Sequence, residues 1–308
     1  MPLNPDFINV AELTRQAALK LLEECDALSA PVDLVDLCQK NDWPLSFEHL
    51  ENDKSAATTL MDGDYIQIVV NTKYSDNADG FSSDSSLRRR QRFSLAHEIG
   101  HACLNTHNKY ELQKLLTEAD NPHRGRYKLL RESQANEFAS ELLLPEPLLK
   151  AQMKKFRWDD VINAASEIAD AFDVSLTVAL RRITNLADFA ALMFYFDSNG
   201  TAPQRAITSK YFSDTGLTIP SGTSMPNGSL VARLASDPSS RVSTMRNMNA
   251  SIWFGQGQKA QGFKIQEWAH RLGSYGYLSF LAVTEDEDWS GGRNSRGEYD
   301  DDDDDWMS

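Results

Sequence analysis

The chain has 308 residues, of which 41% are hydrophobic and 25% charged, a balance typical of a folded soluble protein with room for two domains. Its formal net charge is −14, and residues 285–308 carry eleven acidic but only two basic side chains. This charge excludes a protein that mainly grips nucleic-acid phosphates, so we do not expect direct nucleic-acid binding.

Nothing at the N-terminus is typical of a signal peptide, and no apolar stretch approaches the ~20 residues needed to span a bilayer. The three cysteines, Cys25, Cys38 and Cys103, lack the spacing of a metal site and fit a reducing compartment. We therefore expect a cytoplasmic protein that makes no contact with a membrane.

The first half of the chain combines helices with two short strands. Helices are expected over residues 11–25, 31–38 and 129–144, and strands over 43–47 and 64–70. Residues 72–86 are rich in Ser, Asp and Asn and are expected to form a loop. Arginines 88–90 and 92 follow this loop directly.

The segment His97-Glu98-Ile99-Gly100-His101 contains the pattern H-E-x-x-H. On a helix the two histidines lie one turn apart on one face, where two imidazoles can bind one zinc ion. Glu98 lies beside the first histidine and can take the proton of a water molecule at the metal. The pattern alone also occurs in unrelated amphipathic helices, so a third ligand is needed to decide its meaning.

Two residues compete as the third ligand. His107 gives the spacing H-E-x-x-H-x5-H, but the metzincin pattern requires glycine at position 104, where this chain has Leu104. Glu132 lies on the helix expected over residues 129–144. Asn136 follows one turn later, where it can hydrogen-bond a ligand histidine. The sequence favours Glu132 over His107.

Residues 159–185 are expected to form a helix-turn-helix-like pair. The second helix has only two basic residues, Arg181 and Arg182, beside an acidic first helix, which argues against DNA contact. On the preceding helix, Glu137 and Glu141 point away from the face of Glu132 and are expected to be solvated.

From about residue 188 the pattern changes from helices to strands. Strands are expected over 190–196, 205–209, 251–254, 262–268 and 277–283, with a short helix over 229–234. These elements predict a separate α+β domain on an antiparallel sheet, without a visible catalytic motif. The acidic tail is expected to be disordered.

The segment Arg92–His101, followed by Glu132–Pro145, resembles the ImmA/IrrE family of bacterial and phage metallopeptidases. The resemblance covers roughly residues 10–185. It implies one zinc ion per chain, bound by His97, His101 and Glu132 in a gluzincin-like set, with Glu98 as the catalytic base. Family members typically act on a helix-turn-helix repressor and so release stress-response or mobile-element genes. The radiation-response branch carries a C-terminal GAF-like sensor domain.

The expected fold is therefore α+β. It comprises a mostly helical, zincin-like metallopeptidase domain with a small sheet over residues 1–150, a helix-turn-helix-like helical segment over 151–187, an α+β domain over 188–284 as an analogue of the GAF-like sensor, and a disordered tail over 285–308.

The expected function is that of a zinc-dependent endopeptidase whose protein substrate is a helix-turn-helix repressor. The peptide is expected to lie along the edge of the strand at 64–70, and arginines 88–90 either meet an acidic substrate or form a solvated charge run. The alternative is a zinc-containing regulator or antitoxin that binds a partner without proteolysis. Glu98 favours the enzyme, because a pure binder has no need of a base.

Overall fold

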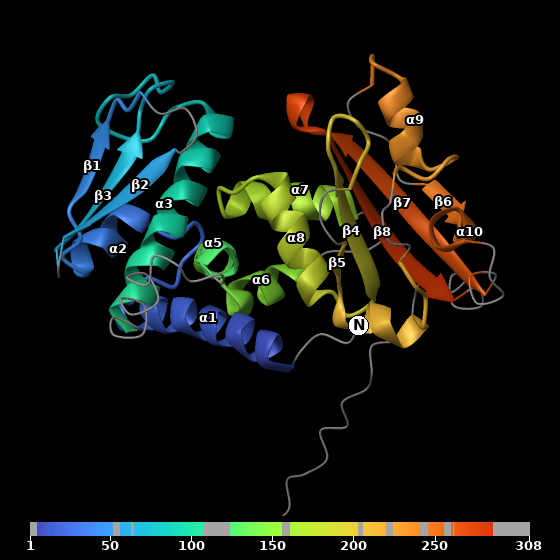
Figure 1. Cartoon of the computed structure of the whole chain (residues 1–308), viewed down its shortest axis with the longest axis horizontal. Helices are drawn as coiled ribbons and strands as arrows, with labels where there is room; N and C mark the ends of the chain where they lie inside the picture. Colours follow the sequence, from blue (N-terminus) through green and yellow to red (C-terminus); the bar gives the residue numbers. More distant parts are fainter. Residues whose placement is uncertain are drawn as a thin grey trace, which may run out of the picture. The chain divides into compact units, whose positions relative to one another are not determined.

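The computed structural model of the chain describes residues 5–51, 56–62, 65–107, 124–155, 161–202, 206–219, 224–240, 246–255, 260 and 262–285. The chain divides into two compact units, Met1–Ile183 and Thr184–Ser308 (Figure 1). Each unit combines helices with a small sheet, so the chain is α+β. Among the described helices, none is both long and apolar enough to cross a membrane. The tail predicted to be disordered lies, beyond residue 285, outside the described residues.

A three-stranded sheet forms one part of the first unit. β3 (Tyr65–Asn71) lies in the middle, pairing parallel with β1 (Leu45–Glu48) and antiparallel with β2 (Ala57–Asp62). Its run of apolar residues is mostly buried, as a central strand requires. The expectation that this strand offers an edge to a peptide is therefore wrong, because both of its edges are hydrogen-bonded. Among the described strands, β1 and β2 form the two edges of this sheet.

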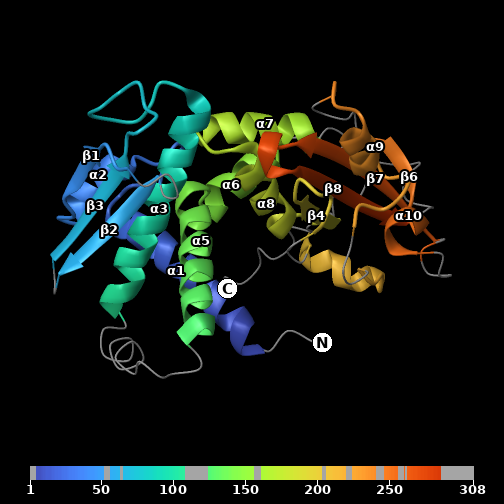
Figure 2. The same ribbon diagram turned by 45° about the horizontal axis from the view of Figure 1, so that its top comes forward.

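Seven described helices complete the first unit and the join to the second: α1 (Pro5–Glu24), α2 (Leu34–Lys40), α3 (Ser85–His107), α5 (Arg124–Leu143), α6 (Glu146–Met153), α7 (Val161–Ala171) and α8 (Leu176–Leu186). α3 packs against β2 on one side and α5 on another (Figures 1 and 2). The close approach of α5 depends on Gly100, where an added Cβ would lie 3.2 Å from the Cβ of Phe138.

Three arginines near the start of α3 bind the end of α7 and the turn that follows it. Arg88 donates through Nε to Asp173 Oδ2 at 2.9 Å, Arg89 to Asp170 at 2.6 Å, and Arg92 to the Asp173 carbonyl at 3.3 Å. Burial raises the pKa of the Asp173 carboxyl, but the hydrogen bonds and charges of the arginines outweigh it, and the net pKa is lowered. Arg88 and Arg89 therefore form neither a solvated charge run nor a substrate contact.

Two further ion pairs join α5 to α8. Arg182 donates to Glu141 Oε2 at 2.6 Å, and both side chains are fully buried. Arg181 donates to Glu137 at 2.9 Å closer to the surface. The expectation that Glu137 and Glu141 are solvated is therefore wrong, because the two arginines of α8 face α5 and neutralise them.

The second unit contains a five-stranded antiparallel sheet of order β5-β4-β8-β7-β6. Its elements are β4 (Ala190–Phe196), β5 (Ile207–Thr208), η2 (Lys210–Thr215), α9 (Leu230–Ser236), β6 (Arg246–Asn249), α10 (Ser251–Phe254), β7 (Phe263–Arg271), η3 (Gly273–Tyr275) and β8 (Tyr277–Glu285). The expected strand at 251–254 is instead the single helical turn α10. Asn249 Oδ1 accepts a hydrogen bond from the backbone N–H of Ser251 at the start of this turn, and Gly255, at φ 79°, ends it.

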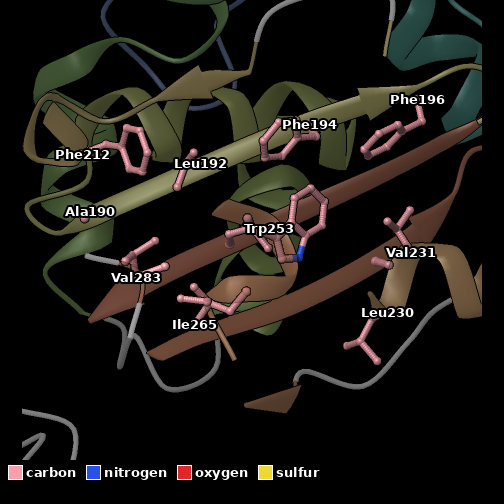
Figure 3. Close-up of a cluster of buried hydrophobic side chains, with 14 of the residues drawn as sticks. Ala190, Leu192, Phe194, Phe196, Phe212, Leu230, Val231, Trp253, Ile265 and Val283 are labelled. Atoms are coloured by element: carbon pink, nitrogen blue, oxygen red, sulfur yellow. The ribbon is translucent and has the colours of Figure 1, made fainter. Parts of the chain in front are cut away.

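The core of the second unit lies on one face of this sheet. Trp253 of α10 stacks on Phe194 with ring centroids 4.8 Å apart, next to Phe196 (Figure 3). Glu267 is fully buried below them and accepts hydrogen bonds from Trp253 Nε1 and from the backbone N–H of Val231. These contacts tie α9 and α10 to the sheet.

Candidate metal centre

His97 and His101 lie one turn apart on α3, with ring centroids 4.6 Å apart and ring planes at 85°. Glu132 reaches them from α5. Its Oε2 lies 3.3 Å from His97 Nε2, and its Oε1 lies 3.7 Å from His101 Nε2. The candidate ligand atoms of all three residues lie within 4.8 Å of one another. Two helices thus bring Glu132 to two histidines that lie 35 and 31 positions before it in the sequence.

This arrangement fits a tetrahedral zinc ion. Ligand bonds of ~2.0–2.1 Å at tetrahedral angles place neighbouring ligand atoms about 3.3 Å apart, close to the observed spacings. Burial, and next the charge of His97, lower the pKa of His101 to about 4. Its imidazole is therefore neutral at physiological pH, as metal binding requires. With these three residues as its ligands, a zinc ion would keep a fourth position open, as in catalytic rather than structural zinc sites.

Asn136 orients the first histidine. Its Oδ1 lies 3.0 Å from His97 Nδ1, one turn beyond Glu132 on α5. When the amide oxygen accepts this hydrogen bond, Nδ1 carries the proton and Nε2 keeps a free lone pair directed at the centre. The same helix therefore carries a candidate ligand and the group that sets the tautomer of another.

Glu98 lies beside the three candidate ligands and contacts the edge of the sheet. Its Oε2 accepts a hydrogen bond of 2.6 Å from Thr59 Oγ1 of β2. Burial raises the pKa of Glu98, although the hydrogen bond from Thr59 and the charge of His97 oppose this rise. Thr59 was not identified from the sequence, because its role depends on how β2 pairs and not on any local motif.

A cavity of about 350 Å³ opens above these groups. It is lined by Ala56, Arg90, Phe93, Ser94, His97, Glu98, His101 and Glu132. The Glu132 side chain is 46% exposed, so the centre is accessible from solvent. The competing ligand His107 is the last residue of α3, and its side chain lies outside the described residues.

The H-E-x-x-H helix, the glutamate from a second helix and the open cavity define the class of metal-dependent peptidases. Residues 82–184 match the profile of the IrrE N-terminal-like domain. The chain is also similar to the radiation response metalloprotease IrrE of Deinococcus radiodurans, with 34% identity over 96 residues. This match spans 31% of the chain but only 27% of that relative.

The fold is similar to that of a solved Mycobacterium tuberculosis transcriptional regulator. The TM-score is 0.58 over 89% of this chain and 76% of that one, and at 14% identity this likeness concerns the fold alone. The sequence matches agree with the resemblance inferred from the two motifs: residues 82–184 are similar to the IrrE N-terminal-like domain.

Proposed function

We propose that the protein is a zinc-dependent endopeptidase that cleaves a helix-turn-helix repressor and so derepresses stress-response or mobile-element genes. The observation that carries this proposal is the position of Glu98, a half-buried carboxylate beside the His97–His101–Glu132 cluster and anchored by Thr59. A site that only binds a partner has no need of such a base. The metallopeptidase family supports the reaction, and the repressor substrate follows from what is typical of that family.

His97, His101 and Glu132 would hold the zinc ion, which when bound polarises the scissile carbonyl and makes water more acidic. Glu98 accepts the proton of the attacking water and later delivers it to the leaving amine. Burial raises the pKa of Glu98 above its ordinary value, which makes the carboxylate a stronger base. Thr59 holds Oε2, so Oε1 remains available for the proton.

The edge strand β2 is the proposed docking edge for the substrate backbone. Among the described strands it pairs only with β3, so it is an edge strand, the position at which a peptide can add to a sheet. Ala56, just before β2, lines the cavity, and Thr59 contacts Glu98. This edge therefore passes along the cavity.

We further propose that three segments of the chain have different roles. Residues 1–150 act as the zincin-like catalytic domain, residues 151–187 as the helix-turn-helix-like segment, and residues 188–284 as a sensor without chemistry of its own. In the described part of the chain, the cluster at His97 is the one group of His, Cys, Asp or Glu suited to a metal ion, which supports this assignment. The proposed setting is the cytoplasm, where the three free cysteines remain reduced.

Substitution of Glu98 by glutamine tests the mechanism. Zinc content and fold should survive, because Gln keeps the size and hydrogen-bond geometry of Glu. Cleavage of the repressor, followed by mass spectrometry, should fall by ~10²–10⁴-fold. Glu167→Gln, on the exposed face of α7, is the matched control and should cleave as wild type does. If Glu98→Gln released the target genes in cells as well as wild type, a regulator or antitoxin that binds its partner without proteolysis would replace the peptidase.

A further inference from the structure

One arginine faces the cavity of the metal centre. Arg90 lines this cavity together with His97 and Glu98. Seven residues separate Arg90 from His97, so on α3 they lie on the same face, about 10.5 Å apart along the helix axis. The cavity lining therefore extends from the candidate metal ligands toward the N-terminal end of α3.

Arg90 differs from the other arginines of this run. Arg88, Arg89 and Arg92 are bonded to the turn between α7 and α8. Arg90 is exposed, and within the described ranges no carboxylate forms an ion pair with it. The guanidinium groups of Arg88, Arg89 and Arg92 thus stabilise the packing of α3, whereas the guanidinium group of Arg90 is available to a ligand in the cavity.

The charges of the cavity lining make the Arg90 guanidinium selective for acidic side chains. The other ionisable groups of the lining are the two histidines and the carboxylates of Glu98 and Glu132, and the whole chain carries a net charge of −14. Apart from the metal position, an acidic side chain entering the cavity would find one favourable partner among the lining residues, Arg90. A guanidinium can bind a carboxylate through two parallel hydrogen bonds, which gives geometric as well as charge selection.

We infer that Arg90 is a specificity-determining residue that selects an aspartate or glutamate side chain of the substrate near the scissile bond. The inference rests on the proposed peptidase function and names the substrate class. An extended peptide advances ~3.3 Å per residue, so the 10.5 Å separation corresponds to about three residues. With the reach of the arginine side chain, the selected acid lies about two to four residues from the bond that is cut.

A random dodecapeptide library provides the test. The zinc-loaded wild type cleaves the library, and mass spectrometry gives the residue frequencies around each cut. Asp and Glu should be enriched at a position two to four residues from the cut. For matched peptides, Asp at that position should raise kcat/KM about 5- to 50-fold over Asn, mainly through KM, because the contact is a charge-assisted hydrogen bond in a solvent-accessible cavity.

Three variants assign the effect to this residue. Arg90→Gln should abolish the preference for Asp, and Arg90→Glu should replace it with a preference for Lys. Arg89→Gln, the adjacent arginine that pairs with Asp170, should keep the preference of the wild type. Retention of the Asp preference in Arg90→Gln, or no acidic preference in the wild type, would overturn the inference.

A binding measurement separates this inference from the peptidase proposal. Metal-free Glu98→Gln protein is immobilised, and retention of the acidic and neutral members of the library is compared, with and without the additional Arg90→Gln change. If no peptide is cleaved but acidic peptides are retained through Arg90, the peptidase proposal fails and the recognition of acidic segments stands. If cleavage occurs but neither cleavage nor retention depends on Arg90, the recognition fails and the peptidase proposal stands. Equal retention without any cleavage overturns both.

Discussion

Breaking the buried ion pair between α5 and α8 should destabilise the unit that carries the metal centre. Glu141 and Arg182 are 0% and 1% exposed, and Arg182 Nε has no hydrogen-bond partner. Burial raises the pKa of Glu141 even though Arg182 lowers it, so the pair contributes little net stability as it stands. Removing only one of its charges should lower the stability of the unit, because the other charge then remains buried without a counter-ion.

The expected loss for Glu141→Gln is about 3 kcal/mol. Removing one partner of a buried pair costs roughly 3–5 kcal/mol. The lower end applies here because glutamine keeps an acceptor for the backbone N–H of Glu146, which Glu141 Oε1 binds at 2.7 Å in the wild type. For a unit of this size, the melting temperature falls ~2–4 °C per kcal/mol, which gives a drop of about 6–12 °C in differential scanning calorimetry.

A matched pair between the same two helices supplies the control. Arg181 and Glu137 are 37% and 18% exposed, so Glu137→Gln should cost at most about 1 kcal/mol. The double variant Glu141→Gln/Arg182→Met removes both buried charges and should recover most of the loss. Equal melting temperatures for the two single variants, or a double variant less stable than Glu141→Gln, would refute this account of the pair.

Three further predictions concern the metal centre and its support. Glu132→Ala should nearly abolish zinc binding measured by elemental analysis, whereas His107→Ala should leave zinc binding intact. Asn136→Ala should weaken zinc binding by about 10- to 100-fold. Strong zinc binding by Glu132→Ala would exclude Glu132 as a ligand. Thr59→Val removes a hydrogen bond that lowers the pKa of Glu98, the proposed catalytic base. The acid limb of the pH profile of kcat/KM should therefore move to higher pH, whereas a limb that stays in place would show that this bond is unimportant. Because the folded-state pKa of Asp173 is lowered, its stabilising effect is present above pH 3.8, the ordinary value, and is lost as the pH falls through the folded-state value. Asp173→Asn should therefore lower the urea midpoint at pH 7, and this difference should shrink below pH 3.8; a constant difference would point to another cause.

The placement of the candidate site residues on one face of each helix could be predicted, because it depends on helix geometry alone. His97 and His101, like Glu132 and Asn136, are four residues apart, and on any α-helix that spacing places both side chains on one face. The sequence of each helix therefore determined which side chains could share a centre. Which helix supplies the third ligand was inferred from the one-turn spacing of Glu132 and Asn136 and from Leu104, which does not fit the metzincin pattern.

The contacts between distant segments depended on tertiary structure. Thr59 meets Glu98 only because β2 occupies the edge of the sheet beside α3, and edge or centre is decided by strand pairing. The local sequence does not show which arginines near residue 90 find carboxylates, because those carboxylates lie more than 80 residues away, at the end of α7 and in the turn that follows it.

Short apolar segments were also ambiguous from sequence. Residues 251–254 were expected to form a strand, but a run of four residues has too little periodicity to distinguish a strand from a helical turn. The structure places Trp253 in the core from the turn α10, with its Nε1 donating to Glu267. Periodicity within a helix therefore determined which residue pairs face the candidate metal centre, whereas long-range packing alone decided the anchor of Glu98, the availability of Arg90 and the conformation of α10.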